Sequence, residues 1–216
     1  MTKREEILRF IAQKIIDIQK PNAIIVAIDG VDGAGKTTLA DQLVPILDSL
    51  GKTVIRSSID NFHNSEEIRY QKGKDSSEGY YEDSFNYDAL KNLLLVPLRE
   101  NRHYQTVFFD YRKNRQVKSK KQIAPKNSVL VFDGVFLFRP EINEFWDFRI
   151  FVDVDFSVSV KRAVQRDIQS GLQTHTEEKY SKKYVPGQRL YLSKVDPKSL
   201  ADMIIDNNDP QNPKVK

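Results

Sequence analysis

The sequence predicts an α/β fold of three layers, in which a mainly parallel sheet lies between helices. Apolar runs typical of buried parallel strands alternate along the chain with segments of helical periodicity. The first apolar run, residues 23–28, leads into a glycine-rich loop at 30–37 that opens onto a helix. The length of 216 residues suits one domain with a full core.

Local patterns define the elements of the N-terminal half. Residues 1–20 form a leading amphipathic helix, because their isoleucines recur at helical spacing on one face. The run 23–28 is unbroken and rich in β-branched residues, as a strand buried on both faces requires. Residues 38–47 follow with apolar positions at helical spacing. A glycine ends that helix, and 53–60 is a second strand with Asp60 at its carboxyl end.

A long polar stretch, residues 64–87, follows the second strand, and segments of that length commonly cover active sites. The same patterns of periodicity then predict a helix at 88–98, strands at 106–110, 129–134 and 148–153, a charged helix at 157–171 and a strand at 201–206. We expect a single domain over 1–216, with a lid at 157–190 and a loose tail at 207–216.

The loop after the first strand matches G-x-x-x-x-G-K-[ST] at every position. The residues expected to bind ATP are Gly30, Val31, Asp32, Gly33, Ala34, Gly35, Lys36, Thr37 and Thr38. In this motif backbone N–H groups turn inward around the phosphates, the lysine reaches the β- and γ-phosphates, and the threonine hydroxyl binds Mg²⁺. The helix N-terminus behind the loop also favours anions. The sequence therefore predicts binding of ATP or GTP with Mg²⁺.

Charged side chains are expected around this loop. Asp133 ends an apolar strand as a Walker B aspartate does, so it is a candidate Mg²⁺ ligand beside Thr37. Asp60 has two candidate tasks, which are to accept a proton from an acceptor hydroxyl or to bind Mg²⁺. Arg162 and Arg166 lie one turn apart on the charged helix, where they can stabilise a transferring phosphoryl group.

The predicted catalytic set is therefore Lys36, Asp60, Arg162 and Arg166. Phosphoryl transfer needs mainly positioning and charge neutralisation from the protein. Two covers, one polar and one rich in arginine, are expected to close over an acceptor and exclude water. This arrangement favours a kinase over a hydrolase.

Composition limits the partners. The net charge is +4 and the basic residues cluster at 112–121, but no nucleic-acid-binding signature accompanies them, so a solvated hairpin or loop is expected there. No apolar run is long enough to span a membrane. The absence of cysteine fits a reducing cytoplasm. A small-molecule acceptor is the expected partner, and the sequence leaves open whether the protein is a homo-oligomer.

Several segments resemble uridine kinases. Residues 60–63, Asp-Asn-Phe-His, resemble their D-x-F-[YH] element, and 79–90 resembles their ribose-binding segment. Residues 131–134 resemble their hydrophobic-E-G strand, with Asp in place of Glu, and the resemblance runs from about Ile24 to Asn207. It implies a P-loop NTPase three-layer sandwich with five strands in the order 2-3-1-4-5 and a helical lid. The implied activity is transfer of the γ-phosphate of ATP or GTP to a nucleoside hydroxyl.

The resemblance also implies an acceptor site, whose candidate residues are His63, Tyr81, Asp83, Asn86, Phe109 and Asn114. Asn86 stands where uridine kinases place an aspartate on the ribose hydroxyls. Phe109 and Asn114 stand where they place an aromatic residue and a histidine on the pyrimidine. Stacking tolerates any base, so we expect a ribosyl acceptor with relaxed or changed pyrimidine selectivity.

The sequence leaves three alternatives to a nucleoside kinase open. A kinase of pantothenate, of another ribosyl metabolite or of a small alcohol has a similar sheet. Thymidylate kinase has a loop like residues 29–38, although its Asp-Arg-aromatic element is absent here. Residues 193–196, Ser-Lys-Val-Asp, superficially resemble the N-K-x-D element of GTP-operated switch proteins, but no apolar strand precedes them.

Overall fold

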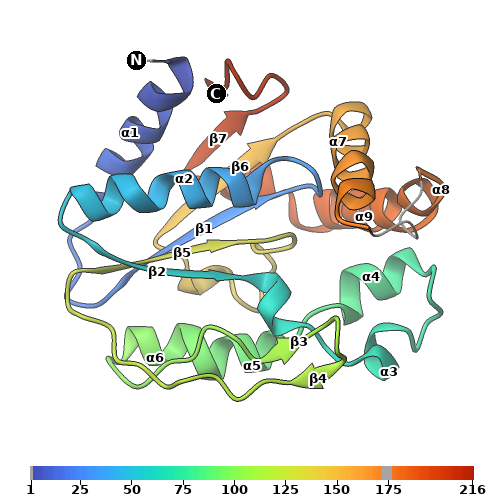
Figure 1. Ribbon diagram of the computed structural model, residues 1–216, viewed down its shortest axis with the longest axis horizontal. Coiled ribbons are helices and arrows are strands. Elements are labelled where there is room, and N and C mark those ends of the chain that lie inside the picture. The colour runs from blue at the N-terminus through green and yellow to red at the C-terminus, as the bar shows by residue number, and fades with distance from the viewer. Residues whose placement is uncertain (1, 172–176) are drawn as a thin grey trace.

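The computed structural model describes residues 2–171 and 177–216, and a six-stranded sheet forms its centre (Figure 1). The strands are β1 (Ile24–Gly30), β2 (Thr53–Ser58), β5 (Ser128–Asp133), β6 (Phe148–Asp153), β7 (Met203–Asp206) and β8 (Lys214–Val215). Their order is β2-β5-β1-β6-β7-β8, and all neighbours are parallel except β7 and β8. Counted along the chain, the five parallel strands follow the expected order 2-3-1-4-5, and β8 adds an antiparallel edge.

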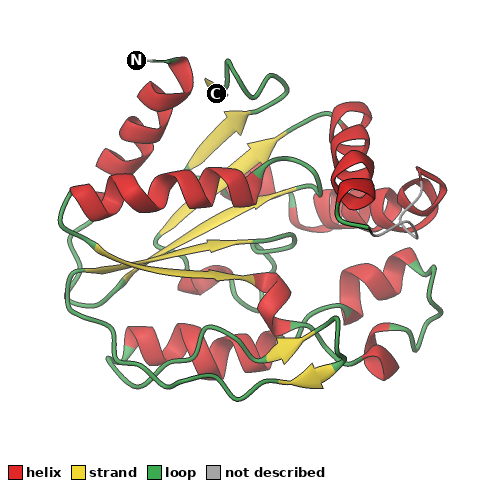
Figure 2. Cartoon of the chain, viewed as in Figure 1, coloured by secondary structure: helices red, strands yellow, loops and turns green. Residues whose placement is uncertain are grey.

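Helices cover both faces of the sheet, which gives the predicted three layers (Figure 2). One face carries α1 (Lys3–Ile16) and α2 (Lys36–Ser49), and the other carries α5 (Tyr87–Leu90), η2 (Lys91–Leu95) and α6 (Val96–Arg99). Alternate residues of β1 enter two separate cores: Ile24, Val26 and Ile28 pack with α1 and α2, whereas Ile25 and Ala27 pack with the opposite helices. The α/β fold class is confirmed.

The two expected covers are both helical where the structure describes them. The turn η1 (Ile59–Phe62) precedes the polar stretch, which forms α3 (Glu66–Arg69) and α4 (Ser77–Asp83). The lid region forms α7 (Phe156–Gln169), α8 (Glu177–Lys179), η4 (Tyr180–Tyr184) and α9 (Val185–Val195). Short connections complete the chain, η3 (Asn143–Phe145) and α10 (Pro197–Leu200). Residues 172–176 of the expected lid lie outside the described residues. Within the described ranges, no helix has the length and apolar character that crossing a membrane requires.

The strand predicted at 106–110 does not join the central sheet. Only β3 (Phe109–Asp110) is a strand, and it pairs with β4 (Arg115–Gln116) as a separate hairpin. Asn114 adopts a left-handed φ of 45° in the turn, which lets the chain reverse within a few residues. This hairpin includes the first part of the basic segment 112–121, for which a solvated hairpin or loop was expected.

The tail predicted to be loose is also different in the structure. Asn207 is buried, and β8 pairs with β7. Lys216 Nζ lies 3.0 Å from Asp153 Oδ2 and 3.1 Å from Asp206 Oδ2, so the last residue is tied to two strand ends. The polar residues of this segment make contacts with neighbouring polar groups, so its polar composition does not indicate a loose tail.

The polar cover and the lid touch each other where α4 packs on α9. Gly187 of α9 is buried at this contact, and a Cβ atom there would lie 2.7 Å from the Ser77 carbonyl oxygen and 2.7 Å from Tyr80 Cδ1. Both distances are shorter than van der Waals contact, so only glycine permits this approach.

We predict that Gly187→Ala lowers the free energy of unfolding by about 1–3 kcal/mol, despite the higher helix propensity of alanine, because the helices must separate. Urea unfolding measures the change. Ser193→Ala, at an exposed position of the same helix, is the matched control and should have little effect. Equal stability of the two variants would show that α4 and α9 separate at no cost.

Candidate active site

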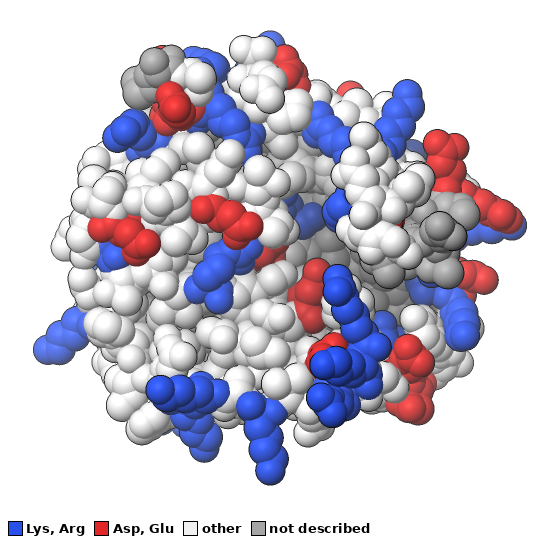
Figure 3. Space-filling model, in the orientation of Figure 1, with Lys and Arg blue, Asp and Glu red and all other residues white. Residues whose placement is uncertain are grey.

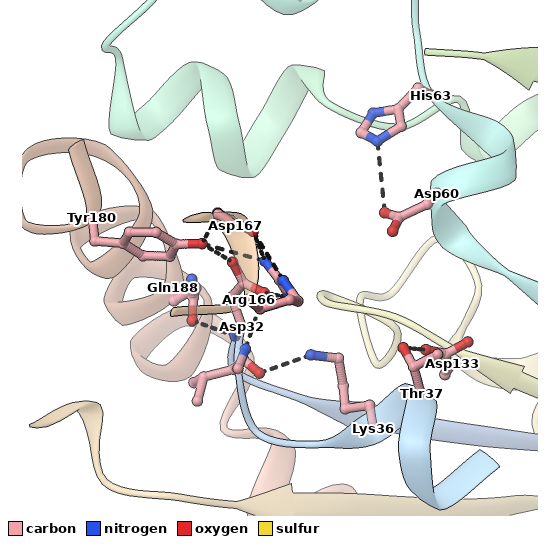
Figure 4. A network of polar contacts seen from close by, with 12 residues as sticks. Asp32, Lys36, Thr37, Asp60, His63, Asp133, Arg166, Asp167, Tyr180 and Gln188 are labelled. Carbon is pink, nitrogen blue, oxygen red and sulfur yellow. Dashed lines mark hydrogen bonds and ion pairs between the residues drawn. The ribbon is translucent and has the colours of Figure 1, made fainter. Parts of the chain in front are cut away.

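The glycine-rich loop joins β1 to α2 as the motif predicts. Gly30, Gly33 and Gly35 all have positive φ angles, which the turning backbone requires. Lys36 is buried at the start of α2, and its Nζ donates a hydrogen bond of 2.7 Å to the Val31 carbonyl (Figure 4). The loop, its lysine and the helix N-terminus thus have the arrangement of a phosphate cradle.

Thr37 and Asp133 meet beside the loop. Thr37 Oγ1 donates a hydrogen bond of 2.5 Å to Asp133 Oδ2, and Arg56 Nη1 lies 2.7 Å from Asp133 Oδ1. The described residues contain no group of three His, Cys, Asp or Glu side chains that could hold a metal alone. Mg²⁺ in phosphate-binding sites takes one or two protein ligands and fills the rest with phosphate oxygens and water, so this hydroxyl and carboxylate fit the ion.

The lid holds the loop through Asp32. Arg166 Nη1 lies 3.1 Å from Asp32 Oδ1, Tyr180 OH lies 3.0 Å from Asp32 Oδ2, and Gln188 Oε1 accepts a hydrogen bond of 2.9 Å from Asp32 N. Burial acts to raise the pKa of Asp32, but the charges of Arg166 and Lys36 outweigh it and lower that pKa. Burial likewise acts to lower the pKa of Arg166, and the Asp32 carboxylate raises it instead. The carboxylate is therefore ionised, and it keeps Arg166 beside the loop.

Arg162 has a different position from Arg166, although both were predicted as catalytic. Its guanidinium donates to two backbone carbonyls, Asn207 O at 2.9 Å and Asn208 O at 2.7 Å. These bonds join α7 to the segment after β7. Of the two arginines, Arg166 is therefore the candidate for contact with phosphate.

Asp60 and His63 lie across an open space from the loop (Figure 4). The Asp60 side chain is 65% exposed, and His63 Nε2 lies 3.6 Å from its Oδ1. His63 Nδ1 lies 3.0 Å from the Ser84 carbonyl oxygen, which can only accept, so Nδ1 carries a proton and Nε2 faces Asp60. In the described part of the chain, no hydrogen bond or ion pair joins Asp60 to Thr37 or Asp133.

The molecular surface is hollowed on the face that shows this space, with basic and acidic side chains around the hollow (Figure 3). Asp60 ends no strand, contrary to expectation, because β2 stops at Ser58, whose hydroxyl accepts from Asp60 N across the first turn of η1. The turn nevertheless leaves Asp60 exposed at the carboxyl end of the sheet, where ligands of such folds bind.

Four of the predicted acceptor residues have structural roles. Tyr81 lies in the apolar core beneath the Arg139 guanidinium, 4.5 Å from the ring centre, and Phe109 is also buried. Asn86 Oδ1 accepts from Ala89 N at 2.8 Å and caps α5. Asn114 Oδ1 accepts from Glu66 N at 2.9 Å, so the amide predicted to contact a base holds the start of α3.

His63 and Asp83 keep polar atoms that a ligand can use. Asp83 Oδ2 is buried and makes no hydrogen bond to a described residue, and its nearest cation is Lys72 Nζ at 3.8 Å. A buried carboxylate oxygen without a donor is costly, which makes Asp83 a candidate for an acceptor hydroxyl.

Some residues that hold the phosphate loop in place were not predicted from the sequence. Besides Tyr180 and Gln188, these include Asp29, which is fully buried at the end of β1. Burial raises the pKa of Asp29 to about 6, against hydrogen bonds from Tyr191 OH and Gly30 N. Tyr191 lies 162 residues from Asp29, and Asp32 lies 148 residues from Tyr180 and 156 from Gln188, so no local pattern could have identified these contacts.

Comparison with known proteins identifies the family. The sequence profile of the Phosphoribulokinase / Uridine kinase family matches residues 25–212. The chain belongs to this family, which confirms the resemblance and makes it a P-loop kinase. Membership implies a nucleotide as phosphate donor and a small molecule as acceptor.

Individual relatives are distant. The uridine kinase of Leuconostoc citreum is 27% identical over 146 residues, which are 67% of this chain and 69% of that protein. The uridine-cytidine kinase-like 1 of Mus musculus is 27% identical over 153 residues, which are 69% of this chain and 27% of the mouse protein. A structure described as "a Possible Uridine Kinase from Bacillus stearothermophilus" has a TM-score of 0.74 at 24% identity, covering 93% of this chain and 97% of the other. This last likeness shows the shared fold.

We predict that Asp60→Asn lowers kcat about 100-fold or more while ATP affinity is largely kept, because the amide preserves size but cannot accept a proton. Steady-state kinetics with an acceptor that the enzyme phosphorylates measures the effect. If kcat is unchanged and only thermal stability falls, Asp60 is a structural residue of the η1 turn.

Proposed function

We propose that this protein transfers the γ-phosphoryl group of ATP or GTP to a hydroxyl of a ribosyl compound, as a uridine kinase-like enzyme. One observation carries the proposal: the exposed carboxylate of Asp60 faces the phosphate loop and Lys36 across an open space (Figure 4). A carboxylate in that position can bind the acceptor hydroxyl, while the loop binds the donor.

The chain's own groups supply the chemistry of transfer. Lys36 binds the β- and γ-phosphates, and Thr37 and Asp133 hold Mg²⁺, which neutralises phosphate charge when it is bound. The acceptor oxygen attacks the γ-phosphorus as the bond to the bridging oxygen of the donor breaks. The hydroxyl proton passes to Asp60, and Arg166 moves from Asp32 to the transferring phosphoryl group.

Water must be kept from the donor phosphate. The contact of α4 with α9 brings the polar cover against the lid, and Tyr80 lies in that contact with its ring 4.9 Å from the ring of Tyr184. Closed covers favour transfer to an acceptor over hydrolysis.

The acceptor class is supported on the sugar side only. Asp60 and His63 offer a carboxylate and an imidazole nitrogen near the space, and Asp83 has a buried carboxylate oxygen without a hydrogen bond to a described residue. Such groups suit sugar hydroxyls. On the base side, Asn114 is engaged by Glu66 N and Phe109 is buried, so neither offers the contact expected from the sequence. We therefore propose little discrimination between bases.

A kinase of a small alcohol is the second candidate. It is favoured by the structural use of Tyr81, Asn86 and Asn114, because a small polar acceptor needs no contact beyond Asp60, His63 and Asp83.

We predict that ribosides of different bases have kcat/KM values within about 10-fold of one another, and that 2′-deoxy forms fall by about 100-fold or more, because a lost hydroxyl leaves buried polar groups unpaired. Coupled measurement of ADP release across ribo- and deoxynucleosides, pantothenate and glycerate measures this pattern.

Asn86→Asp is the matched variant, since both residues cap a helix equally well and stability should hold. One oxygen of the new carboxylate would keep the cap on Ala89 N, and the other could accept a charged hydrogen bond from a sugar hydroxyl, so kcat/KM for ribosides should rise about 10-fold. Strong uridine selectivity would contradict the argument about the base. Activity with a small alcohol but with no riboside would replace the riboside by the second candidate.

A further inference from the structure

The segment after β7 connects elements that are distant in the sequence. Asn207 is 5% exposed, and its N–H donates 2.9 Å to the Asp153 carbonyl at the end of β6. Its carbonyl accepts from Arg162 of the lid helix α7 at 2.9 Å. Its side-chain amide contacts both the phosphate loop and helix α1. Asn207 therefore lies between the sheet, the lid, the loop and the N-terminal helix.

The amide nitrogen of Asn207 orients one peptide of the loop. Asn207 Nδ2 donates a buried hydrogen bond of 2.7 Å to the Ala34 carbonyl oxygen. In a trans peptide the C=O and the N–H point in opposite directions, so this bond also fixes the direction of Gly35 N–H. The loop can bind phosphate only if such N–H groups turn inward, and Asn207 holds the carbonyl outward. A Cβ atom on Gly35 would lie 2.7 Å from Asn207 Nδ2, so glycine is required for this approach.

Arg4 of α1 determines which end of the Asn207 amide faces the loop. Arg4 Nη1 donates 3.3 Å to Asn207 Oδ1 and 3.2 Å to the Pro210 carbonyl, while Arg4 Nε donates 2.7 Å to Gln42 Oε1. A guanidinium has donors and no acceptor, so the amide must present its oxygen to Arg4 and its nitrogen to Ala34. If the amide were flipped, its oxygen would face the Ala34 carbonyl oxygen, and the two acceptors could form no hydrogen bond.

We propose that Arg4 is a positioning residue for the nucleoside triphosphate, which acts through Asn207 on the Ala34–Gly35 peptide. Helix α1 precedes residues 25–212, the part that matches the family, so this contact reaches the loop from outside the matched region. The proposal rests on the proposed function, because it requires that the loop binds a nucleotide.

The substitution Asn207→Asp separates positioning from anchoring. A carboxylate keeps its attraction to Arg4, so α1 stays attached, but it has no hydrogen to donate to the Ala34 carbonyl. A purely structural role of Asn207 predicts that this variant binds nucleotide normally below its melting temperature. A positioning role predicts weaker binding in a protein that is still folded.

The experiment measures Kd by calorimetry for the β,γ-imido analogues of ATP and GTP with Mg²⁺, well below each variant's Tm. Asn207→Asp should bind at least about 10-fold more weakly, and Arg4→Met about 3- to 10-fold, as loss of one hydrogen bond predicts. Arg9→Met, at an exposed position of the same helix, is the control and should bind like the wild type. Lys36→Ala should lose most binding.

The outcomes separate the two proposals. Wild-type affinity in both Asn207→Asp and Arg4→Met, beside a Lys36→Ala variant that has lost binding, overturns the role of Arg4 and leaves the proposed function standing. Equal weakening by Arg9→Met also overturns it, since the effect would then come from α1 as a whole. A Lys36→Ala variant that binds like the wild type overturns the proposed function and the role of Arg4 with it.

Discussion

The shape of the phosphate loop depends on side chains that reach it from outside. Asn207 donates to the Ala34 carbonyl, Gln188 accepts from Asp32 N, and Asp133 accepts from Thr37 Oγ1. Glycines give the loop freedom to turn, and that freedom carries an entropic cost that these contacts offset. The parallel sheet brings Asp133 and Asn207 to the loop, because the carboxyl ends of its strands meet at one edge, and Gln188 reaches the loop from helix α9 of the lid.

The lid and the loop form one charged unit through Asp32. Asp32 is ionised in a half-buried position because Arg166 and Lys36 stand beside it. The same carboxylate keeps Arg166, whose side chain is 54% exposed, close to where phosphate charge would develop. An exchange of Arg166 from Asp32 to phosphate moves a cation between two anions, which costs less than bringing it from water.

Local patterns predicted the fold well, because they depend on residues close in sequence. The strand–loop–helix unit around Lys36, the buried strand ending at Asp133 and the helix of Arg166 all follow from periodicity and motif. The polar asparagines were harder, since the side chains of Asn86 and Asn114 cap helices with the same atoms that would bind a substrate.

Contacts between distant residues could not be predicted from one sequence. Arg162 looked identical to Arg166 on the helix, yet its partners are carbonyls some forty-five residues away. The tail looked loose because its composition is polar, but those polar groups bind Arg4 and Arg162. Membership of the family supplies the kinase class.

A kinase whose covers close over its site transfers phosphate to an acceptor and not to water. Phosphorus NMR of the wild-type protein with Mg²⁺, ATP and a riboside that it phosphorylates measures ADP, phosphorylated acceptor and inorganic phosphate together. We expect one phosphorylated acceptor for each ADP, with little inorganic phosphate. Inorganic phosphate equal to ADP, or a bound nucleoside diphosphate that no acceptor releases, would contradict it.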